Sequence, residues 1–412
     1  MAPPMVLLER HVDFCHDAAA VPIPSLCPWG VSKKAASDAV IEYLRALKAR
    51  AVIASPPQLS SLRILPPPNS APLLGLRSGH ISSADKNLVA LYAGGYRPGA
   101  ETFAEMGAYL IYDARDGSLS VIPPIPCDDE YLAMGQQSAV VMCDATGGGY
   151  FLAELVWVMP GFSRAAVWLW ESSAKEWVLK PGCLPNIAMD FSIHSCFSYR
   201  GSTFCWVDLH QGMVLCDLHQ GCKLSFIELP QGRPNYDASV PWPGGLCAEE
   251  FRSVACVRGS IKFLAFNEFV ERKPGEEYGL TVWTLYPDHP GWSISYQCSV
   301  QDIWANTNYQ SAGLGQLAPS LPVLSIHQDG VVYLVVNDTS VVGKDRRLVH
   351  KAQYLLRVDM GNNNDVQVYQ QKTTHIYSQL FASEFSAHQR QDHPVLLPPL
   401  SMFGASGKKT KA

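Results

Sequence analysis

Short apolar runs alternate with polar residues along most of the chain after about Lys86. These runs are rich in Val, Tyr, Trp and Phe, and Gly, Asp, Asn and Pro separate them. A period of two places successive side chains on opposite faces of a strand, and the separating residues are those that turns require. The pattern therefore predicts an all-β fold over this part of the chain.

One segment has a different period, from Ser32 to Val52, with the sequence SKKAASDAVIEYLRALKARAV. Its apolar residues recur at steps of three and four, which gathers them on one side of a helix. That apolar stripe consists of Ala36, Val40, Ile41, Leu44 and Leu47, and the opposite side carries Lys34, Asp38, Glu42 and Arg45. The segment is predicted to be an amphipathic helix that packs on the parent domain, with a partner protein as the alternative.

Five segments share one order of features: an alternating apolar strand, a polar turn, and a second strand with an aromatic or aliphatic residue soon after the turn. They are AYLIYDARDGSLSVIPPIP from Ala108, AVWLWESSAKEWVLKPGCLP from Ala166, GMVLCDLHQGCKLSFIELP from Gly212, LTVWTLYPDHPGWSISYQC from Leu280, and QYLLRVDMGNNNDVQVYQQ from Gln353. Each is predicted to be a β-hairpin.

Three further segments place a glycine turn before a strand of aromatic and β-branched residues, at Gly201, Gly259 and Gly330. A turn, a buried strand and an outer hairpin in succession describe one four-stranded propeller blade. Ala139 to Val158 takes the same place before the Ala166 hairpin. The predicted fold is thus an all-β, β-propeller-like array of about six four-stranded blades with one N-terminal helix. The alternative is two β-sandwich domains divided near Gly244.

The predicted organisation has three parts. Residues 1–60 hold an N-terminal strand and the helix, residues 61–395 form the propeller-like domain, and residues 396–412 form a flexible basic tail. The ring is expected to close by pairing an N-terminal strand, Met5 to Leu8 or Leu62 to Leu65, with a C-terminal strand from Thr374 to Phe381.

Composition excludes several classes of protein. Hydrophobic residues make up 47% and charged residues 17% of the 412 positions, which is typical of a globular chain. The balance of 32 basic and 37 acidic residues includes no basic stripe, so a nucleic-acid partner is not expected. The N-terminus lacks a secretory pattern and no window approaches a membrane span, so the chain is expected to be cytoplasmic or nuclear, not secreted and not bound to a membrane.

The densest group of reactive residues lies in CFSYRGSTFCWVDLHQGMVLCDL, from Cys196 to Leu218. The candidate metal ligands are Cys196, Cys205, Cys216 and His210 in this segment, with His194 just before it. Structural zinc sites use paired cysteines two to four residues apart, and these cysteines are much more widely spaced. The twelve cysteines include no Cys-x-x-Cys pair and are interpreted as reduced, mostly buried thiols. Neither a metal site nor a cofactor is predicted.

The pentapeptide DLHQG occurs twice in the same region, at Asp208 to Gly212 and at Asp217 to Gly221. Aspartate accepts backbone hydrogen bonds in turns, so the repeat predicts two turns of one kind. Gly147-Gly-Gly149 is predicted to lie in a hairpin loop, because a strand follows it where a phosphate-binding loop requires a helix. The tryptophans at strand positions are assigned to packing between blades, and no catalytic residue is predicted.

The segment from Ser198 to Pro230, SYRGSTFCWVDLHQGMVLCDLHQGCKLSFIELP, resembles the plant domain-of-unknown-function family DUF1618, which is expanded in grasses. VLLERHV, PPQLSSLRI and AVWLWESSAKEW extend the resemblance over most of the chain, with its core at residues 194–340. The resemblance implies a propeller-like fold akin to F-box-associated and kelch-like domains, and no established activity. The sequence has no F-box motif.

The sequence therefore favours a non-catalytic scaffold or adaptor that binds a protein through its loops. Two loops are singled out, Glu271 to Tyr278 and Val342 to His350, because specificity concentrates in loops on a rigid scaffold. The alternative is an enzyme or a binder of a small ligand, for example a carbohydrate, that uses the central channel. The sequence does not identify the partner protein.

Overall fold

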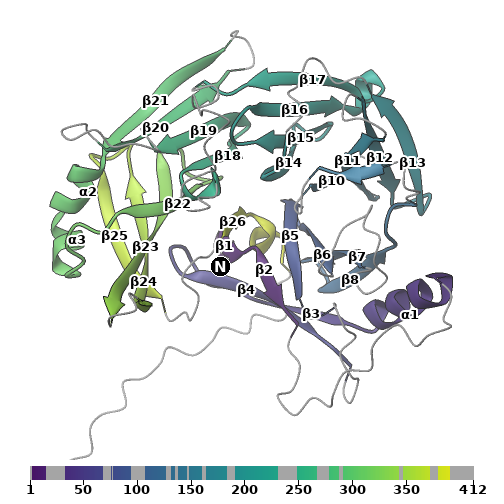
Figure 1. Ribbon diagram of the computed structural model, residues 1–412, viewed down its shortest axis with the longest axis horizontal. Helices are drawn as coiled ribbons and strands as arrows, with labels where there is room; N and C mark the ends of the chain where they lie inside the picture. Colours follow the sequence, from purple (N-terminus) through teal and green to yellow (C-terminus); the bar gives the residue numbers. More distant parts are fainter. Residues whose placement is uncertain are drawn as a thin grey trace, which may run out of the picture.

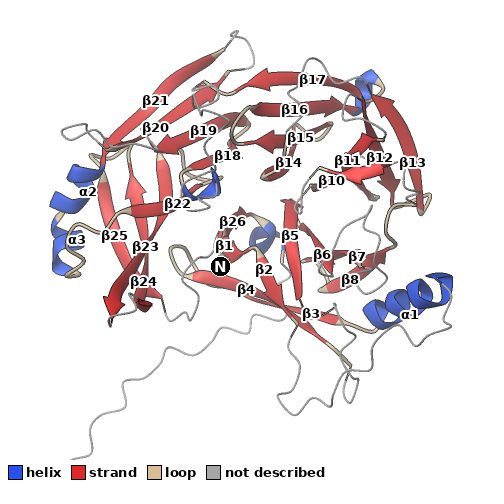
Figure 2. Ribbon diagram, in the orientation of Figure 1, coloured by secondary structure: helices blue, strands red, loops and turns tan. Residues whose placement is uncertain are grey.

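The computed structural model describes residues 2–14, 33–67, 76, 78–93, 107–126, 131–134, 138–145, 148–159, 164–182, 191–230, 248–266, 278–286, 291–342, 347–371 and 379–389. Their strands form six sheets that stand around a ring, as Figure 1 shows. Strands dominate and helices are few (Figure 2). The fold is a six-bladed β-propeller, which confirms the predicted architecture, and the alternative of two β-sandwich domains is wrong.

Each blade has four or five strands. Blade one comprises β2 (His11–Asp13), β5 (Ser78–Asp85), β6 (Leu88–Ala93), β7 (Ala108–Asp113) and β8 (Ser118–Ile122). Blade two comprises β10 (Ala139–Cys143), β11 (Tyr150–Val158), β12 (Arg164–Glu171) and β13 (Glu176–Gly182), with β9 (Tyr131–Ala133) paired to β11. Blade three comprises β14 (Ser195–Tyr199), β15 (Thr203–Asp208), β16 (Gly212–Asp217) and β17 (Lys223–Glu228).

The remaining blades follow the same plan. Blade four comprises β18 (Arg252–Val257), β19 (Ser260–Phe266), β20 (Gly279–Leu285) and β21 (Trp292–Ser299). Blade five comprises β22 (Pro319–Leu324), β23 (Val331–Val342), β24 (Arg347–Asp359) and β25 (Asp365–Gln371). Blade six comprises β26 (Leu380–Ser383), β1 (Val6–Glu9), β4 (Leu59–Leu65) and β3 (Lys48–Val52). All five predicted hairpins are present as the outer pairs of blades one to five.

Blade six closes the ring with strands from both ends of the chain. β1 pairs antiparallel with β26, from Val6 opposite Ser383 to Glu9 opposite Leu380. β1 also pairs with β4, in parallel, and β4 pairs antiparallel with β3. The predicted closure is confirmed for Leu380 and Phe381, whereas residues 374–378 lie outside the described part of the chain.

The predicted helix is present but shorter. α1 spans Lys33–Arg45, and Val40 and Leu44 are buried on the predicted stripe. The prediction that the helix continues to Val52 is wrong, because Lys48–Val52 is the strand β3. Basic and small apolar residues alternate from Lys48 to Ala51, which also suits a strand, and pairing with β4 satisfies the backbone. The side chains of residues 33–37 lie outside the description.

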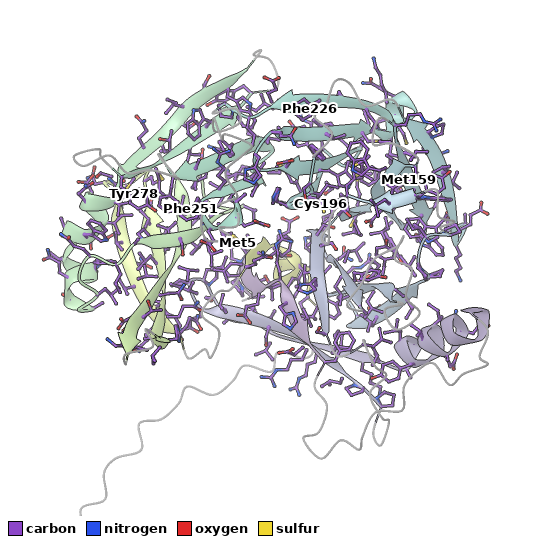
Figure 3. All side chains as sticks on the ribbon, viewed as in Figure 1. Met5, Met159, Cys196, Phe226, Phe251 and Tyr278 are labelled. Carbon is purple, nitrogen blue, oxygen red and sulfur yellow. The ribbon has the colours of Figure 1, made fainter. Side chains whose placement is uncertain are left out.

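The hydrophobic core is divided among the interfaces between neighbouring blades. Separate clusters lie between each successive pair of blades, and the cluster between blades six and one also takes in α1. Trp206 of β15 is 0% exposed, and its indole N–H donates to Ser138 O of blade two at 2.7 Å. Side chains fill the spaces between the ribbons (Figure 3).

In the described part of the chain, the other helices are α2 (Val300–Ala305) and α3 (Thr307–Ser311), which lie between blades four and five, and the short 3-10 helices η2 (Leu218–Gln220), η4 (Ala248–Glu250) and η5 (Phe385–His388). Within the described ranges, no helix has the length and apolar character that a membrane span requires.

Candidate functional site

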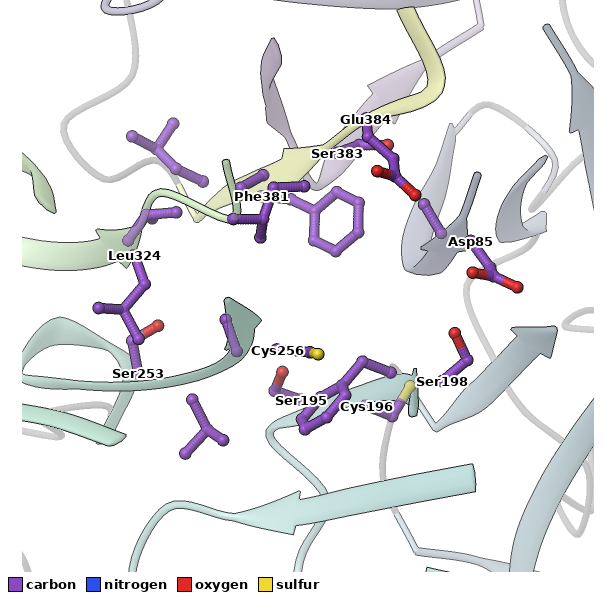
Figure 4. A pocket seen from close by; sticks show the side chains of 18 of the residues that line it. Asp85, Ser195, Cys196, Ser198, Ser253, Cys256, Leu324, Phe381, Ser383 and Glu384 are labelled. Atoms are coloured by element: carbon purple, nitrogen blue, oxygen red, sulfur yellow. The ribbon is translucent and has the colours of Figure 1, made fainter. Parts of the chain in front are cut away.

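The central channel of the propeller contains a cavity of about 360 Å³. Its wall is built from the innermost strands β14, β18, β22 and β26 and from the end of β5, so five of the six blades contribute to it. Figure 4 shows these strands converging on the cavity from opposite sides. The channel is therefore open, and it brings together residues that are far apart in the sequence.

The wall of the cavity is partly apolar and partly polar. Its apolar part includes Leu324 of β22, Phe381 of β26 and the partly exposed Cys256 of β18, which Figure 4 shows. Val254 of β18 also lines it. Hydroxyl groups of Ser195, Ser198, Ser253 and Ser383 are distributed around this apolar surface. Such a surface suits the burial of apolar groups with a few polar contacts.

The charged rim of the cavity consists of Asp85, Lys86, Arg200, Arg258 and Glu384. Lys86, Arg200 and Arg258 lie in the tight turns that follow β5, β14 and β18, so three blades present one exposed basic side chain each at the same end of the channel. All three have positive φ angles, of 50°, 53° and 50°. The turns fix the backbone positions of these three residues at the ends of hairpins.

Arg10 also lines the cavity and is only 8% exposed. It lies between β1 and β2, where the chain passes from blade six to blade one. Its Nη1 donates to Ile81 O and Ser82 O, each at 3.0 Å, and its guanidinium lies 4.7 Å from the centre of the Phe381 ring. Burial lowers the pKa of Arg10, although Cys196 and Glu249 act in the opposite direction.

The thiols near the channel are not activated nucleophiles. Burial raises the pKa of Cys256, and it raises the pKa of the fully buried Cys205 much further. A thiol needs a lowered pKa to supply thiolate at neutral pH. The pKa directions therefore argue against covalent catalysis at Cys256.

The candidate zinc ligands are divided between two faces of blade three. Cys196 and Cys216 pack with Trp206 against blade two, whereas Cys205 lies on the opposite face of the sheet. The rings of His194 and His210 lie 5.2 Å apart. Within the described residues, no group of three or more His, Cys, Asp and Glu side chains is placed to hold a metal ion.

The two DLHQG segments form turns with the same hydrogen bonds, as the repeat predicts. Asp208 accepts from His210 N at 2.8 Å and from Gln211 Nε2 at 2.9 Å. Asp217 accepts from His219 N at 2.8 Å and from Gln220 Nε2 at 3.3 Å. Both aspartates therefore have a structural role.

Other predicted features have mixed outcomes. Residues 271–277 and 343–346 of the two singled-out loops lie outside the described residues. The loop predicted over Val342 to His350 is shorter than expected, because Val342 ends β23 and residues 347–350 begin β24. Gly149 accepts a hydrogen bond from Asp144 N in the hairpin between β10 and β11, as predicted. Trp157 and Trp170 are buried in the clusters on either side of blade two, which confirms packing between blades.

Sequence reasoning missed the channel residues. Arg10 carries a signal that was available, since it is a charged residue between two apolar strand segments in VLLERHV. The rim arginines stand before the predicted turn glycines Gly201 and Gly259, which have positive φ angles of 66° and 81°. Their convergence on one opening depends on the ring and has no local signal.

The sequence matches no curated protein. Solved structures with a similar fold include the β-propeller domain of the Trilobed protease from Pyrococcus furiosus, at 8% identity and a TM-score of 0.32 over 72% of this chain and 96% of that one. TolB from Acinetobacter baumannii gives 12% identity and a TM-score of 0.34 over 84% and 68%. The Bombyx mori GH32 β-fructofuranosidase BmSUC1 gives 12% and 0.35 over 72% and 65%.

TM-scores this low carry no argument about function. The family comparison is more specific, and it falls on the region that the sequence identified as the core. Residues 206–333, from β15 of blade three to β23 of blade five, match the family described as "Protein of unknown function (DUF1618)", which confirms the resemblance.

Proposed function

We propose that this propeller is a non-catalytic interaction scaffold and that its partner protein docks at the charged rim of the central channel. The observation that carries the proposal is a cavity whose wall includes apolar patches and whose rim carries charged side chains from several blades. Protein interfaces commonly have this anatomy, with an apolar centre and a polar edge. The cavity volume of about 360 Å³ suits one or two inserted side chains of the partner.

The rim carries both signs of charge, with Lys86, Arg200 and Arg258 beside Asp85 and Glu384. Charges of both signs on a rigid surface give specificity, because a wrong partner meets like charge. The hairpin turns fix the backbone that carries these side chains, so no loop has to be ordered on association. We also expect a cytoplasmic or nuclear compartment, because the seven described cysteines are free thiols.

The proposal is tested by reversing the basic charges of the rim in the triple variant Lys86→Asp, Arg200→Asp and Arg258→Asp. Aspartate tolerates a positive φ angle, so the turns are preserved. The matched control changes three exposed basic residues away from the cavity, Arg45→Asp, Arg63→Asp and Lys223→Asp. Both variants should unfold at the same temperature as each other.

Affinity purification with quantitative mass spectrometry then compares the two variants with the wild type. We expect a set of proteins that the wild type and the control retain and that the rim variant loses by about tenfold or more. The strongest member of that set is then purified and titrated against all three proteins. Equal binding by the rim variant and the control would overturn the proposal.

A further inference from the structure

We propose that the wall of the central channel contains a small-anion site centred on Arg10, which binds a small molecule carrying a carboxylate or a phosphate. This inference goes beyond the proposed scaffold function, because it concerns a free small ligand inside the channel.

The guanidinium of Arg10 is only partly used by the protein. An arginine has five N–H donors, and the recorded acceptors, Ile81 O and Ser82 O, both bind Nη1. Within the described residues, no acceptor is recorded for the Nε or Nη2 donors. Because Arg10 lines the cavity, these donors are the part of the guanidinium available to a ligand there.

The positive charge of Arg10 also lacks a close counter-charge. No carboxylate of the described residues forms an ion pair with it within 4.0 Å, and Glu249 acts on it only at longer range. A guanidinium stays protonated at neutral pH even when burial lowers its pKa. A buried charge is costly unless it is paired, and a bound oxyanion would supply two parallel hydrogen bonds as well as the charge.

The position of Arg10 is fixed before any ligand binds. Its backbone N–H donates to Gln379 O of the segment before β26, and its carbonyl accepts from Ile81 N of β5, each at 2.8 Å. The register shift in β5 between Ile81 and Ser83 presents two successive carbonyls to Nη1. The guanidinium is thus held from three sides, and little freedom is lost when it binds an anion.

The charges that line the cavity favour an anion. The cationic side chains are Arg10, Lys86, Arg200, Arg252 and Arg258, and the carboxylates are Asp85, Glu249 and Glu384. This excess of cations is local, because the whole chain has a formal charge of −5. A concave, low-dielectric surface concentrates such a field and raises the local concentration of anions.

The size and lining of the cavity restrict the ligand. A volume of about 360 Å³ is near the lower end for small-molecule sites, so the ligand is small. Phe381, Leu324 and Val254 offer an apolar surface to the part of the ligand that carries no charge. The chemical class is therefore a small organic carboxylate or phosphate.

The competing explanation is that Arg10 only supports the irregular part of β5 and that solvent covers its free donors. The two explanations are separated by isothermal titration of the wild type with benzoate, phenyl phosphate and inorganic phosphate. Benzamide and phenol serve as the neutral counterparts of the first two. We expect the anions to bind and the neutral molecules not to bind.

The variant Arg10→Met removes the donors and keeps the apolar stem, and Arg10→Lys keeps the charge without the planar pair of donors. We expect Arg10→Met to weaken anion binding by about tenfold or more, because a charge-assisted hydrogen bond is lost. The matched control Arg115→Gln alters an exposed arginine that pairs with Asp113. It should bind the anions like the wild type.

A second measurement on the wild type covers the case in which Arg10→Met does not fold. Cys256 lines the same cavity and is partly exposed, so a bound anion should slow its alkylation by N-ethylmaleimide. The rate is read from the mass of the Cys256 peptide. The proposal is overturned if the anions leave this rate unchanged and give no binding heat, or if Arg10→Met binds them as the wild type does.

The tests of the two proposals are independent. Loss of the partner protein by the rim variant with no anion binding supports the scaffold alone. Anion binding that depends on Arg10, with a partner set that the rim variant retains, supports the channel site alone.

Discussion

The two DLHQG turns of blade three have the same sequence and the same local hydrogen bonds, but they differ in their surroundings. Asp208 in the first turn is 1% exposed, and it also accepts from Ser192 N at 2.9 Å. Asp217 in the second turn is partly exposed, and it acts as the N-cap of η2. Asp208 therefore joins separate parts of the chain, whereas the side-chain hydrogen bonds of Asp217 stay within its own turn.

The glycines that end the two turns differ in the same way. A side chain at Gly212 would collide with the Ile227 carbonyl and the Phe226 ring, because Gly212 lies inside the ladder between β16 and β17. Gly221 has open space around it, but its φ angle is 68°. One glycine is required for space and the other for its backbone conformation. The DLHQG sequence thus determines the local hydrogen bonds, and the position of the turn in the blade determines how much stability a substitution removes.

The largest difference in stability between the two turns is expected when their aspartates are replaced. Asp208→Ala removes the buried acceptor of three part-buried hydrogen bonds, from Ser192, His210 and Gln211, so the free energy of unfolding should fall by about 3 kcal/mol. Asp217→Ala removes an exposed cap and should cost about 1 kcal/mol. Urea denaturation measures both values. Equal losses would show that the two turns have equivalent surroundings.

Replacing the glycines should give the next largest difference in stability between the two turns. Gly212→Ala should cost about 2 kcal/mol through overpacking, and Gly221→Ala about 1 kcal/mol through its positive φ angle. Asparagine separates the two causes, because it tolerates the left-handed region but needs more space. Gly221→Asn should therefore recover most of the stability, whereas Gly212→Asn should be as damaging as Gly212→Ala. Recovery at Gly212 would contradict the steric explanation.

A smaller difference is expected at the glutamines. Gln211 Nε2 donates to buried Asp208 at 2.9 Å, and Gln220 Nε2 donates to Asp217 at 3.3 Å in a more exposed turn. We expect thermal denaturation to show a loss of about 1 kcal/mol for Gln211→Ala and less than about 0.5 kcal/mol for Gln220→Ala. A larger effect at Gln220 would reverse the comparison.

A further effect depends on pH and concerns only the second turn, which Cys216 and Cys222 flank. A hydrogen bond from the Cys216 thiol, together with Lys180, lowers the pKa of Cys222 to about 7, although burial opposes this shift. The pKa of Cys222 in the folded protein therefore lies below the ordinary thiol value of 9.0, so folding favours the thiolate. This stabilising contribution is present above pH 9 and is lost as the pH falls from 9 to 7.

The measurement is the melting temperature between pH 6 and pH 9. The difference between the wild type and Cys222→Ala should grow as the pH rises. The first turn is flanked by Val207 and Met213, whose side chains do not ionise. Met213→Ala should therefore change the melting temperature by the same amount at pH 6 and at pH 9. A constant difference for Cys222→Ala would show that its thiol does not ionise in this range.

Much of the fold could be predicted from the sequence because its signals are local. Alternation identified the outer hairpins, and the turn glycine Gly330 has the positive φ angle, 77°, that its place before a buried strand predicts. The end of α1 was missed because Lys48–Val52 has acceptable helix propensity, and only its pairing with β4 makes it a strand. The parallel pairing of β1 with β4 joins distant segments and has no local signal.

The candidate site was the least predictable part. Asp208 and Asp217 were correctly assigned to turns, because aspartate two residues before its donor is a local pattern. The cavity has no such pattern, since Arg10, Arg200 and Arg258 converge on it only when the blades assemble. A single arginine gives the same sequence signal whether it faces solvent or a channel.

The closure of the ring by β1 and β26 has a consequence for the order of assembly during synthesis. β1 leaves the ribosome early, but its antiparallel partner β26 follows more than three hundred residues later. Blades two to five are each continuous in sequence and can form in turn as they emerge. Blade six must wait, and so must the contact between Arg10 and Gln379. The channel is therefore completed last, when translation has passed β26, and a nascent chain stalled earlier exposes the apolar edges of blades one and five to chaperones.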